Sequence, residues 1–230
     1  MSFLSVAASV LLIATPAIGW FWLISRLDGN PEPRGLLLRI FGWGMLMLVP
    51  AALFERTLSA WPLLTMLLVG PVEELAKFVA ASSAARDREF DEPIDGLIYA
   101  AVAALGFATL ENVLYVAQGG LSVLLVRGPV TTFSHVLFAV PWGYALSVKR
   151  FRGRRGVLRK GLLVGATLHS VFNLMLTLEG SAGSAWLLIP FAGMLAVMYA
   201  LAARYYARLR PDCRRPRTQR VPTTSLETPS

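Results

Sequence analysis

Among the ionisable side chains in the long apolar stretches of this 230-residue sequence, six could do chemistry together, although a hydrocarbon environment penalises charge. They are Glu73, Glu74, Lys77, Glu111, His135 and His169. A charge at the centre of a bilayer costs about 2.5–3.5 kcal/mol on insertion scales. A chain that carries several such groups in apolar stretches is expected to use them together, which indicates a membrane enzyme.

Carboxylates and imidazoles gathered in a dry pocket can activate water in two ways. A buried glutamate can act as a general base. Alternatively, two histidines and a glutamate can bind Zn²⁺ and leave one position open for a water that ionises near neutral pH; the ligands expected here are His135, His169 and Glu111. Asn173, or one of the histidines, can donate a hydrogen bond to the oxyanion formed at the scissile carbonyl. This set best suits hydrolysis of a peptide bond within or near the bilayer.

The two adjacent glutamates follow Gly70 and Pro71 in the middle of their apolar stretch. Proline removes a backbone donor and clashes with the carbonyl four residues earlier, so a kink is expected that places both glutamates in the first turn of a half-helix. Adjacent helical residues diverge by about 100°, so one carboxylate is expected to face the site while the other holds Lys77 or a neighbouring helix. Glu73 and Lys77 have the i,i+4 spacing of a stabilising pair. The alternative is a buried ion pair that only fixes helix packing.

The other candidate residues lie on three later stretches, and no HExxH sequence is present, so the site would be assembled from separate helices. Glu111 is followed by Asn112, which is expected to support the site. His169 and Asn173 have the i,i+4 spacing that places them on one helix face. A single histidine in an apolar helix is more often a hydrogen-bonded core residue than a ligand. His135 and His169, however, are the only two histidines of the chain, and both lie in apolar stretches.

The elements that must position these residues are predicted to be membrane-spanning helices. Apolar residue types make up 55% of the chain and charged residues 16%, against about 25% charged residues in ordinary soluble domains. Seven stretches approach the ~20 apolar residues that cross a bilayer. They cover about 3–25, 36–55, 60–81, 94–117, 129–148, 161–178 and 185–207. The expected fold class is an all-α polytopic membrane helical bundle over residues 1–208, followed by a disordered basic cytoplasmic tail over residues 209–230.

The net charge of +8 arises from basic residues in alternate connections between these stretches. Most of the 22 Lys and Arg residues lie within residues 26–39, 86–88 and 149–160 or from residue 204 onward. By the positive-inside rule the N-terminus is therefore expected outside and the C-terminus in the cytoplasm. The surplus of basic residues reflects the membrane topology, and it also attracts anionic membrane lipid. Because the topology explains this charge, nucleic acid is not an expected partner. The single cysteine, Cys213, excludes a disulfide framework.

Four short motifs, in this order, resemble those of the PrsW family of intramembrane proteases. EELAK (73–77) matches an EExxK pattern, FATLE (107–111) an FxxxE pattern, His135 the third element and HSVFN (169–173) an HxxxN pattern. The loop DGNPEPRG, residues 28–35, also resembles the family's Asp…Pro-Glu-Pro connection. The resemblance covers about residues 26–180.

The resemblance implies a polytopic protease of the bacterial cytoplasmic membrane, related to the group that contains the CAAX prenyl endopeptidases and bacteriocin-processing enzymes. The family is named for cleaving a membrane-anchored anti-sigma factor. It is commonly called a metalloprotease, with zinc as the implied metal, whereas the related prenyl endopeptidases are discussed as glutamate-dependent. The active-site residues that the resemblance implies are Glu73, Glu74, Glu111, His135 and His169.

The leading hypothesis is an intramembrane endopeptidase that acts on a single-span or membrane-proximal protein. One glutamate of the 73/74 pair would activate water, directly or through a metal ion. A proton- or cation-coupled transporter is the first alternative, because intramembrane Glu, Lys and His chains also form proton relays. Such a transporter would show flux in liposomes without a cleaved product. A non-catalytic membrane adaptor that kept the fold is the second alternative.

Overall fold

The structure, a computed structural model, describes residues 3–26, 28–154, 156–182 and 188–213. Within these ranges the chain forms seven α-helices and no strand, so the predicted all-α class is confirmed. The helices are α1 (Phe3–Ser25), α2 (Arg34–Thr57), α3 (Pro62–Ser82), α4 (Asp95–Gly119), α5 (Ser122–Arg152), α6 (Val157–Ala182) and α7 (Leu188–Cys213). Each of the seven apolar stretches overlaps one of these helices, and residues 185–187 of the last stretch lie outside the described residues.

Three of the described helices are long and apolar enough to cross a membrane. They are α2, α4 and the Val157–Leu178 part of α6. Helix α3 buries two glutamates and a lysine along its length, and these three side chains lower its apolar character. Several apolar helices of this length indicate a multi-pass membrane protein, while crossing by the remaining helices stays a prediction.

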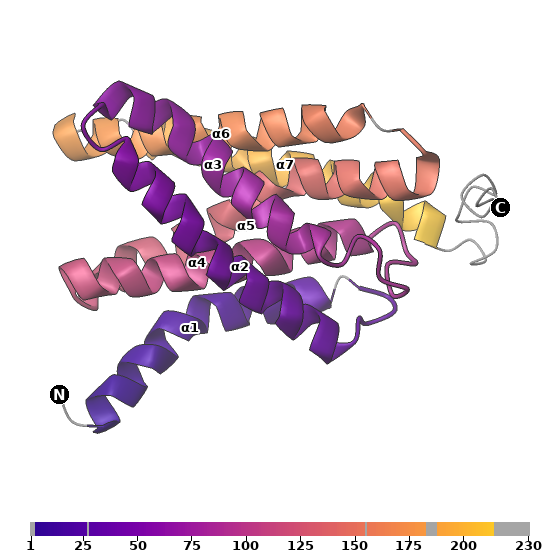
Figure 1. The fold of residues 1–230 in the computed structure, drawn as a ribbon, viewed down its shortest axis with the longest axis horizontal. Coiled ribbons are helices and arrows are strands. Elements are labelled where there is room, and N and C mark those ends of the chain that lie inside the picture. The colour runs from indigo at the N-terminus through magenta and orange to yellow at the C-terminus, as the bar shows by residue number, and fades with distance from the viewer. Residues whose placement is uncertain (1–2, 27, 155, 183–187, 214–230) are drawn as a thin grey trace.

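Helix α4 packs against α1, α2 and α5, and most of its residues from Asp95 to Asn112 are buried (Figure 1). Gly106 lies against the backbone carbonyl of Phe41 in α2, where any larger side chain would clash. Small residues at such contacts let two helix backbones approach closely. This packing holds the part of α4 that carries Glu111.

Helix α3 runs unbroken through Pro71, so the expected start of a half-helix is absent and both glutamates lie within a continuous helix. The structure also gives the reason. Proline leaves the carbonyl of the residue four positions earlier, Leu67, without its helical donor. The hydroxyl of Ser170 in α6 donates to that carbonyl, with an Oγ–O distance of 3.4 Å. A hydroxyl from a neighbouring helix thus replaces the missing hydrogen bond, as membrane helices require.

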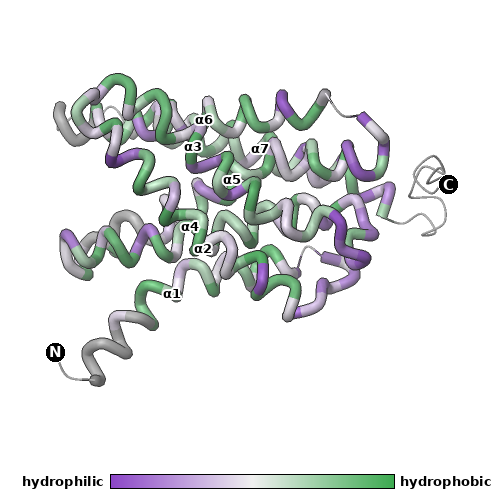
Figure 2. Tube along the Cα trace, in the orientation of Figure 1, coloured by the Kyte–Doolittle hydropathy of each residue, from purple (hydrophilic) through white to green (hydrophobic). Residues whose placement is uncertain are grey.

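The two ends of the bundle differ in polarity. The connections that follow α1, α3 and α5, together with the end of α7, lie at one end of the bundle (Figure 1). Figure 2 shows hydrophilic residues concentrated at this end. Basic residues of the sequence, among them Arg26, Arg86 and Arg152, lie here. The alternation on which the predicted topology depends is therefore present in the fold.

Helix α7 continues to Cys213, past the expected boundary at residue 208. Its last turn is held to α5 by an ion pair between Arg152 and Asp212, with an N–O distance of 2.6 Å. This contact joins the end of α7 to the end of α5. The rest of the expected tail, residues 214–230, lies outside the described residues.

Glu32, in the connection between α1 and α2, makes folding stability depend on pH. Its side chain is buried and accepts a hydrogen bond from the hydroxyl of Tyr99 at 2.8 Å. Burial raises the pKa of Glu32 from 4.5 to about 7, and the carboxylates of Asp28 and Asp91 add to this effect. In the folded state Glu32 therefore keeps its proton up to about pH 7, whereas in the unfolded chain it ionises near pH 4.5. Its contribution to stability is complete below pH 4.5 and is lost as the pH rises through 7.

We expect Glu32→Gln to flatten this pH dependence, because the amide keeps the shape and has no proton to lose. The measurement is the melting temperature in detergent between pH 4.5 and 8. The wild-type value should fall with rising pH more steeply than that of Glu32→Gln. Parallel curves for the two proteins would contradict the assignment.

Candidate active site

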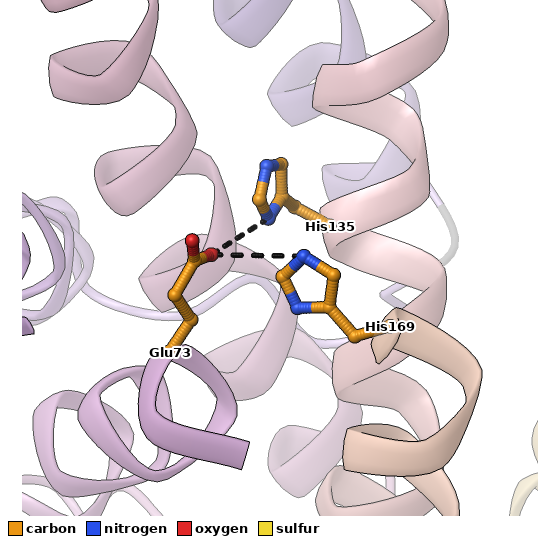
Figure 3. A group of neighbouring side chains, drawn as sticks. All are labelled: Glu73, His135 and His169. Atoms are coloured by element: carbon orange, nitrogen blue, oxygen red, sulfur yellow. Dashed lines mark ion pairs between the residues drawn. The ribbon is translucent and has the colours of Figure 1, made fainter. Parts of the chain in front are cut away.

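Glu73, His135 and His169 come from three different helices and meet inside the bundle. Figure 3 shows the carboxylate of Glu73, on α3, facing the imidazoles of His135, on α5, and His169, on α6. Glu73 Oε2 lies 3.7 Å from His169 Nε2 and 3.9 Å from His135 Nδ1. All three side chains are buried. The motifs that are far apart in the sequence are thus brought to one place.

Lys77 is fully buried one helical turn from the glutamates, and it contacts Glu73, Glu74 and His135. Its Nζ lies 2.7 Å from Glu74 Oε1, 2.8 Å from His135 Nδ1 and 3.4 Å from Glu73 Oε2. An ammonium has three N–H donors and no acceptor, so each donor has a partner here and His135 Nδ1 must accept. The ring proton of His135 therefore lies on Nε2, which donates to Glu111 Oε2 at 2.8 Å.

Glu74 is enclosed by hydrogen-bond donors. Besides Lys77, the indole of Trp142 donates to its Oε2 at 2.9 Å, and His169 Nδ1 lies 3.0 Å from its Oε1. A carboxylate only accepts, so His169 carries its proton on Nδ1 and directs its Nε2 lone pair towards Glu73 (Figure 3). Glu74 therefore fixes both the position and the tautomer of His169.

The adjacent glutamates thus have different surroundings. Glu73 lines a polar cavity, whereas Glu74 holds Lys77, His169 and Trp142. The sequence predicted this division without saying which glutamate takes which place. The tighter ion pair of Lys77 is with Glu74 at i,i+3, rather than with Glu73 at the predicted i,i+4 spacing.

The cavity has a volume of about 490 Å³. The predicted site residues that line it are Glu73, Glu111, His135, His169 and Asn173. It extends to Glu55, Gln118 and Thr177, near the ends of α2, α4 and α6. These helix ends lie away from the basic connections (Figure 1). Water and a peptide segment can therefore be expected to enter from the less basic end of the bundle.

Asn112 does not take part in this cavity. Its amide donates to Thr132 Oγ1 at 3.1 Å, and the side chain is buried between α4 and α5. The expected supporting role at the site is replaced by a role in helix packing. The reason is geometric, since Asn112 points about 100° away from Glu111 around the same helix.

Two residues near the group were not anticipated. Trp142 follows Pro141 in an apolar stretch, where a tryptophan is expected to pack in the hydrophobic core. Its indole N–H nevertheless needs a hydrogen-bond partner when buried. Glu55 lay at the predicted end of the second stretch, where a carboxylate needs no special explanation. Their contact with the site follows from helix packing, which the sequence alone does not define.

Glu73, His135 and His169 form the group among the described residues that could hold a metal ion. One carboxylate oxygen and two imidazole nitrogens lie within 4.8 Å of one another. Two histidines and a glutamate are a known zinc ligand set with one position left for water. The group differs from the predicted ligand set in one member, because Glu73 takes the position expected for Glu111.

The surroundings of the two histidines also suit a metal site. Metal-binding histidines usually donate their other ring nitrogen to a carboxylate or carbonyl. Here His169 is backed by Glu74 and His135 by Glu111. Lys77 competes for His135, since its ammonium already bonds the Nδ1 that would face the ion. The donors therefore fit a metal, provided that Lys77 gives up this one bond.

A buried Glu/His/His group beside a polar cavity in an apolar helical bundle places the protein in the class of membrane-embedded enzymes. The family described as "PrsW family intramembrane metalloprotease" matches residues 32–203. The chain belongs to this family, as its motifs indicated, and it is an intramembrane protease.

Relatives named "Protease PrsW" from three bacteria show the extent of the similarity. The protein from Geobacillus kaustophilus is 32% identical over 168 residues, which cover 69% of this chain and 74% of the relative. The protein from Clostridioides difficile is 31% identical over 188 residues (74% and 79%). The protein from Bacillus subtilis is 31% identical over 186 residues (76% and 83%). No solved structure matches the chain significantly.

Proposed function

We propose that this protein hydrolyses a peptide bond of a single-span or membrane-proximal protein, such as a membrane-anchored anti-sigma factor, at the cavity lined by Glu73. The observation that carries the proposal is the convergence of Glu73, His135 and His169 on one polar cavity inside an apolar bundle. A cavity of this kind brings water to a peptide bond that hydrocarbon would otherwise keep dry. The family match and the hydrogen-bond network around both histidines support it.

Each residue of the cavity has a task in this hydrolysis. Glu111 lines the cavity and is bonded to His135, so it can accept the proton of the attacking water and return a proton to the leaving amine. Asn173 lines the same cavity and can donate its amide N–H to the oxyanion. Glu74 and Lys77 contact the reacting groups only through the histidines and Glu73, and they act as positioning residues.

We also propose that Glu73, His135 and His169 hold a zinc ion. Such an ion, when bound, polarises the scissile carbonyl and makes water ionise near neutral pH. The three side chains are largely buried and line the cavity that brings water to them. Lys77 keeps its bond to Glu74, which holds the backing carboxylate of His169 in place.

Metal removal is expected to abolish cleavage. Exhaustive chelation of the purified protein should lower the rate to the level of an uncatalysed control, and added Zn²⁺ should restore it. Metal analysis should find one zinc per chain in the wild type and less in His169→Ala. Full activity in a sample shown to be metal-free would contradict the metal proposal and favour a glutamate acting alone.

For the topology we propose seven membrane crossings, with the N-terminus outside and the C-terminus on the cytoplasmic face of a bacterial cytoplasmic membrane. Cys213, the single cysteine, ends α7 at the basic end of the bundle and reports on this. A membrane-impermeant maleimide should label Cys213 in inside-out vesicles and not in intact spheroplasts. Labelling in spheroplasts would reverse the orientation.

The proposed function is tested by reconstituting the purified protein in liposomes with single-span substrates tagged at both ends. We expect two tagged fragments with the wild type, and intact substrate with Glu73→Gln. Absence of fragments with every substrate, or equal cleavage by Glu73→Gln, would overturn the proposal.

A further inference from the structure

Glu55 is an additional carboxylate in the cavity that the proposed hydrolysis does not use. It lies near the end of α2 and lines the cavity together with Glu73, Glu111 and both histidines. Its side chain is half-buried, and Oε1 is shielded from solvent without a hydrogen-bond partner. A carboxylate oxygen that lacks a partner within the protein is unfavourable, and a group that enters the cavity can supply the missing donor.

The charges around the cavity define the chemistry of that partner. Three carboxylates, those of Glu55, Glu73 and Glu111, line the cavity, and no lysine or arginine lines it among the described residues. The buried cation nearest to them, Lys77, already bonds Glu74, His135 and Glu73. No ion pair joins Glu55 to a described basic residue, so its side chain is available to a cationic donor that enters the cavity.

The position of Glu55 defines where that cation must lie. The other two carboxylates of the cavity already have tasks in the proposed hydrolysis, Glu73 as a zinc ligand and Glu111 as the proton acceptor. Glu55 lies near the end of α2, as Gln118 and Thr177 lie near the ends of α4 and α6. A single-span substrate that enters from this end with its peptide bond near Glu73 passes this mouth of the cavity, and a lysine or arginine at the edge of a span can extend its charged end to this position.

We propose that Glu55 binds a lysine or arginine side chain of the substrate, adjacent to the scissile bond on the side of the cavity mouth. The inference rests on the proposed function, because the cation is assigned to the substrate of that reaction. Glu55 is then a specificity-determining residue. A charge-assisted hydrogen bond of this kind is worth on the order of tenfold to a hundredfold in kcat/KM.

The test uses a library of single-span substrates in liposomes. Each substrate has a span of about 20 apolar residues, and the residues that follow the span on the less basic side of the protease are randomised. Mass spectrometry of the products gives the scissile bond and the residues beside it. Wild type, Glu55→Gln, Glu55→Lys and the control Glu89→Lys are compared; Glu89 is exposed in the connection between α3 and α4, at the opposite end of the bundle.

The expected wild-type products carry lysine or arginine next to the scissile bond. Glu55→Gln should lose most of this preference through a higher KM for cationic substrates, Glu55→Lys should prefer aspartate or glutamate, and Glu89→Lys should behave like the wild type. A charge swap cannot result from general damage to the fold. Cleavage by the wild type without a basic preference, or the same preference in Glu55→Lys, would overturn the inference and leave the proposed function standing. No cleavage of any library member would instead refute the proposed function, and the inference with it.

Discussion

Replacing Glu73 by glutamine is expected to lower kcat/KM by more than about 100-fold while the protein remains folded. Losing a residue that only supports a metal ligand lowers activity by up to about 100-fold, and the loss of a proposed ligand should exceed this. Glu73 lines the cavity, and its only hydrogen bond to Lys77 is long, at 3.4 Å. Removing its charge also relieves repulsion with Glu74. With both proteins metal-free, the stability change should therefore stay within the ~1.5–3 kcal/mol of one hydrogen bond to a charged group. The measurements are cleavage kinetics in liposomes and thermal unfolding in detergent.

The matched comparison is Glu74→Gln, one residue along the same helix. Glu74 accepts hydrogen bonds from Lys77, Trp142 and His169, so glutamine at this position should cost both stability and activity. Glu89→Gln, an exposed change far from the site, should alter neither. Equal stability loss in Glu73→Gln and Glu74→Gln would show that the two glutamates are not divided between the cavity and the core.

Replacing Lys77 by methionine is expected to destabilise the protein more than either glutamate substitution. Lys77 is fully buried, and its ammonium compensates the charges of Glu73 and Glu74. Removing one partner of a buried ion pair leaves an uncompensated charge and destabilises by about 3–5 kcal/mol. The melting temperature in detergent should fall markedly, and cleavage should be lost because His135 and Glu74 lose their donor.

A double variant separates the charge effect from simple loss of packing. In Lys77→Met with Glu74→Gln, the charge that Lys77 balanced most closely is also removed. Part of the lost stability should return, although cleavage should not. A Lys77→Met protein as stable as the wild type would contradict the buried network around Glu74.

Much of this architecture could be predicted from the sequence, because the signals concerned are local. Each apolar stretch corresponds to a helix, and the costly residues within those stretches, from Glu73 to His169, meet in one place. A charge in an apolar helix is so unfavourable that its partners can be sought among the few other polar groups of the spans.

The remaining features depend on contacts between helices and could not be predicted in this way. That Pro71 does not interrupt α3 depends on Ser170, which lies far along the sequence and donates to the Leu67 carbonyl. The division between Glu73 and Glu74 depends on the positions of Trp142 and His169 around α3. Helical spacing shows that adjacent side chains diverge, and only the neighbouring helices determine which one faces the cavity.

The most direct test of the proposed hydrolysis is to follow the oxygen atom of the attacking water. Purified protein and a single-span substrate are incubated in liposomes in water enriched in ¹⁸O, and the fragments are analysed by mass spectrometry. Hydrolysis at the cavity of Glu73, His135 and His169 predicts a new C-terminus that carries ¹⁸O with the wild type and no fragment with Glu73→Gln. An intact substrate with the wild type, accompanied by ion flux across the liposome membrane, would contradict hydrolysis and identify a transporter instead.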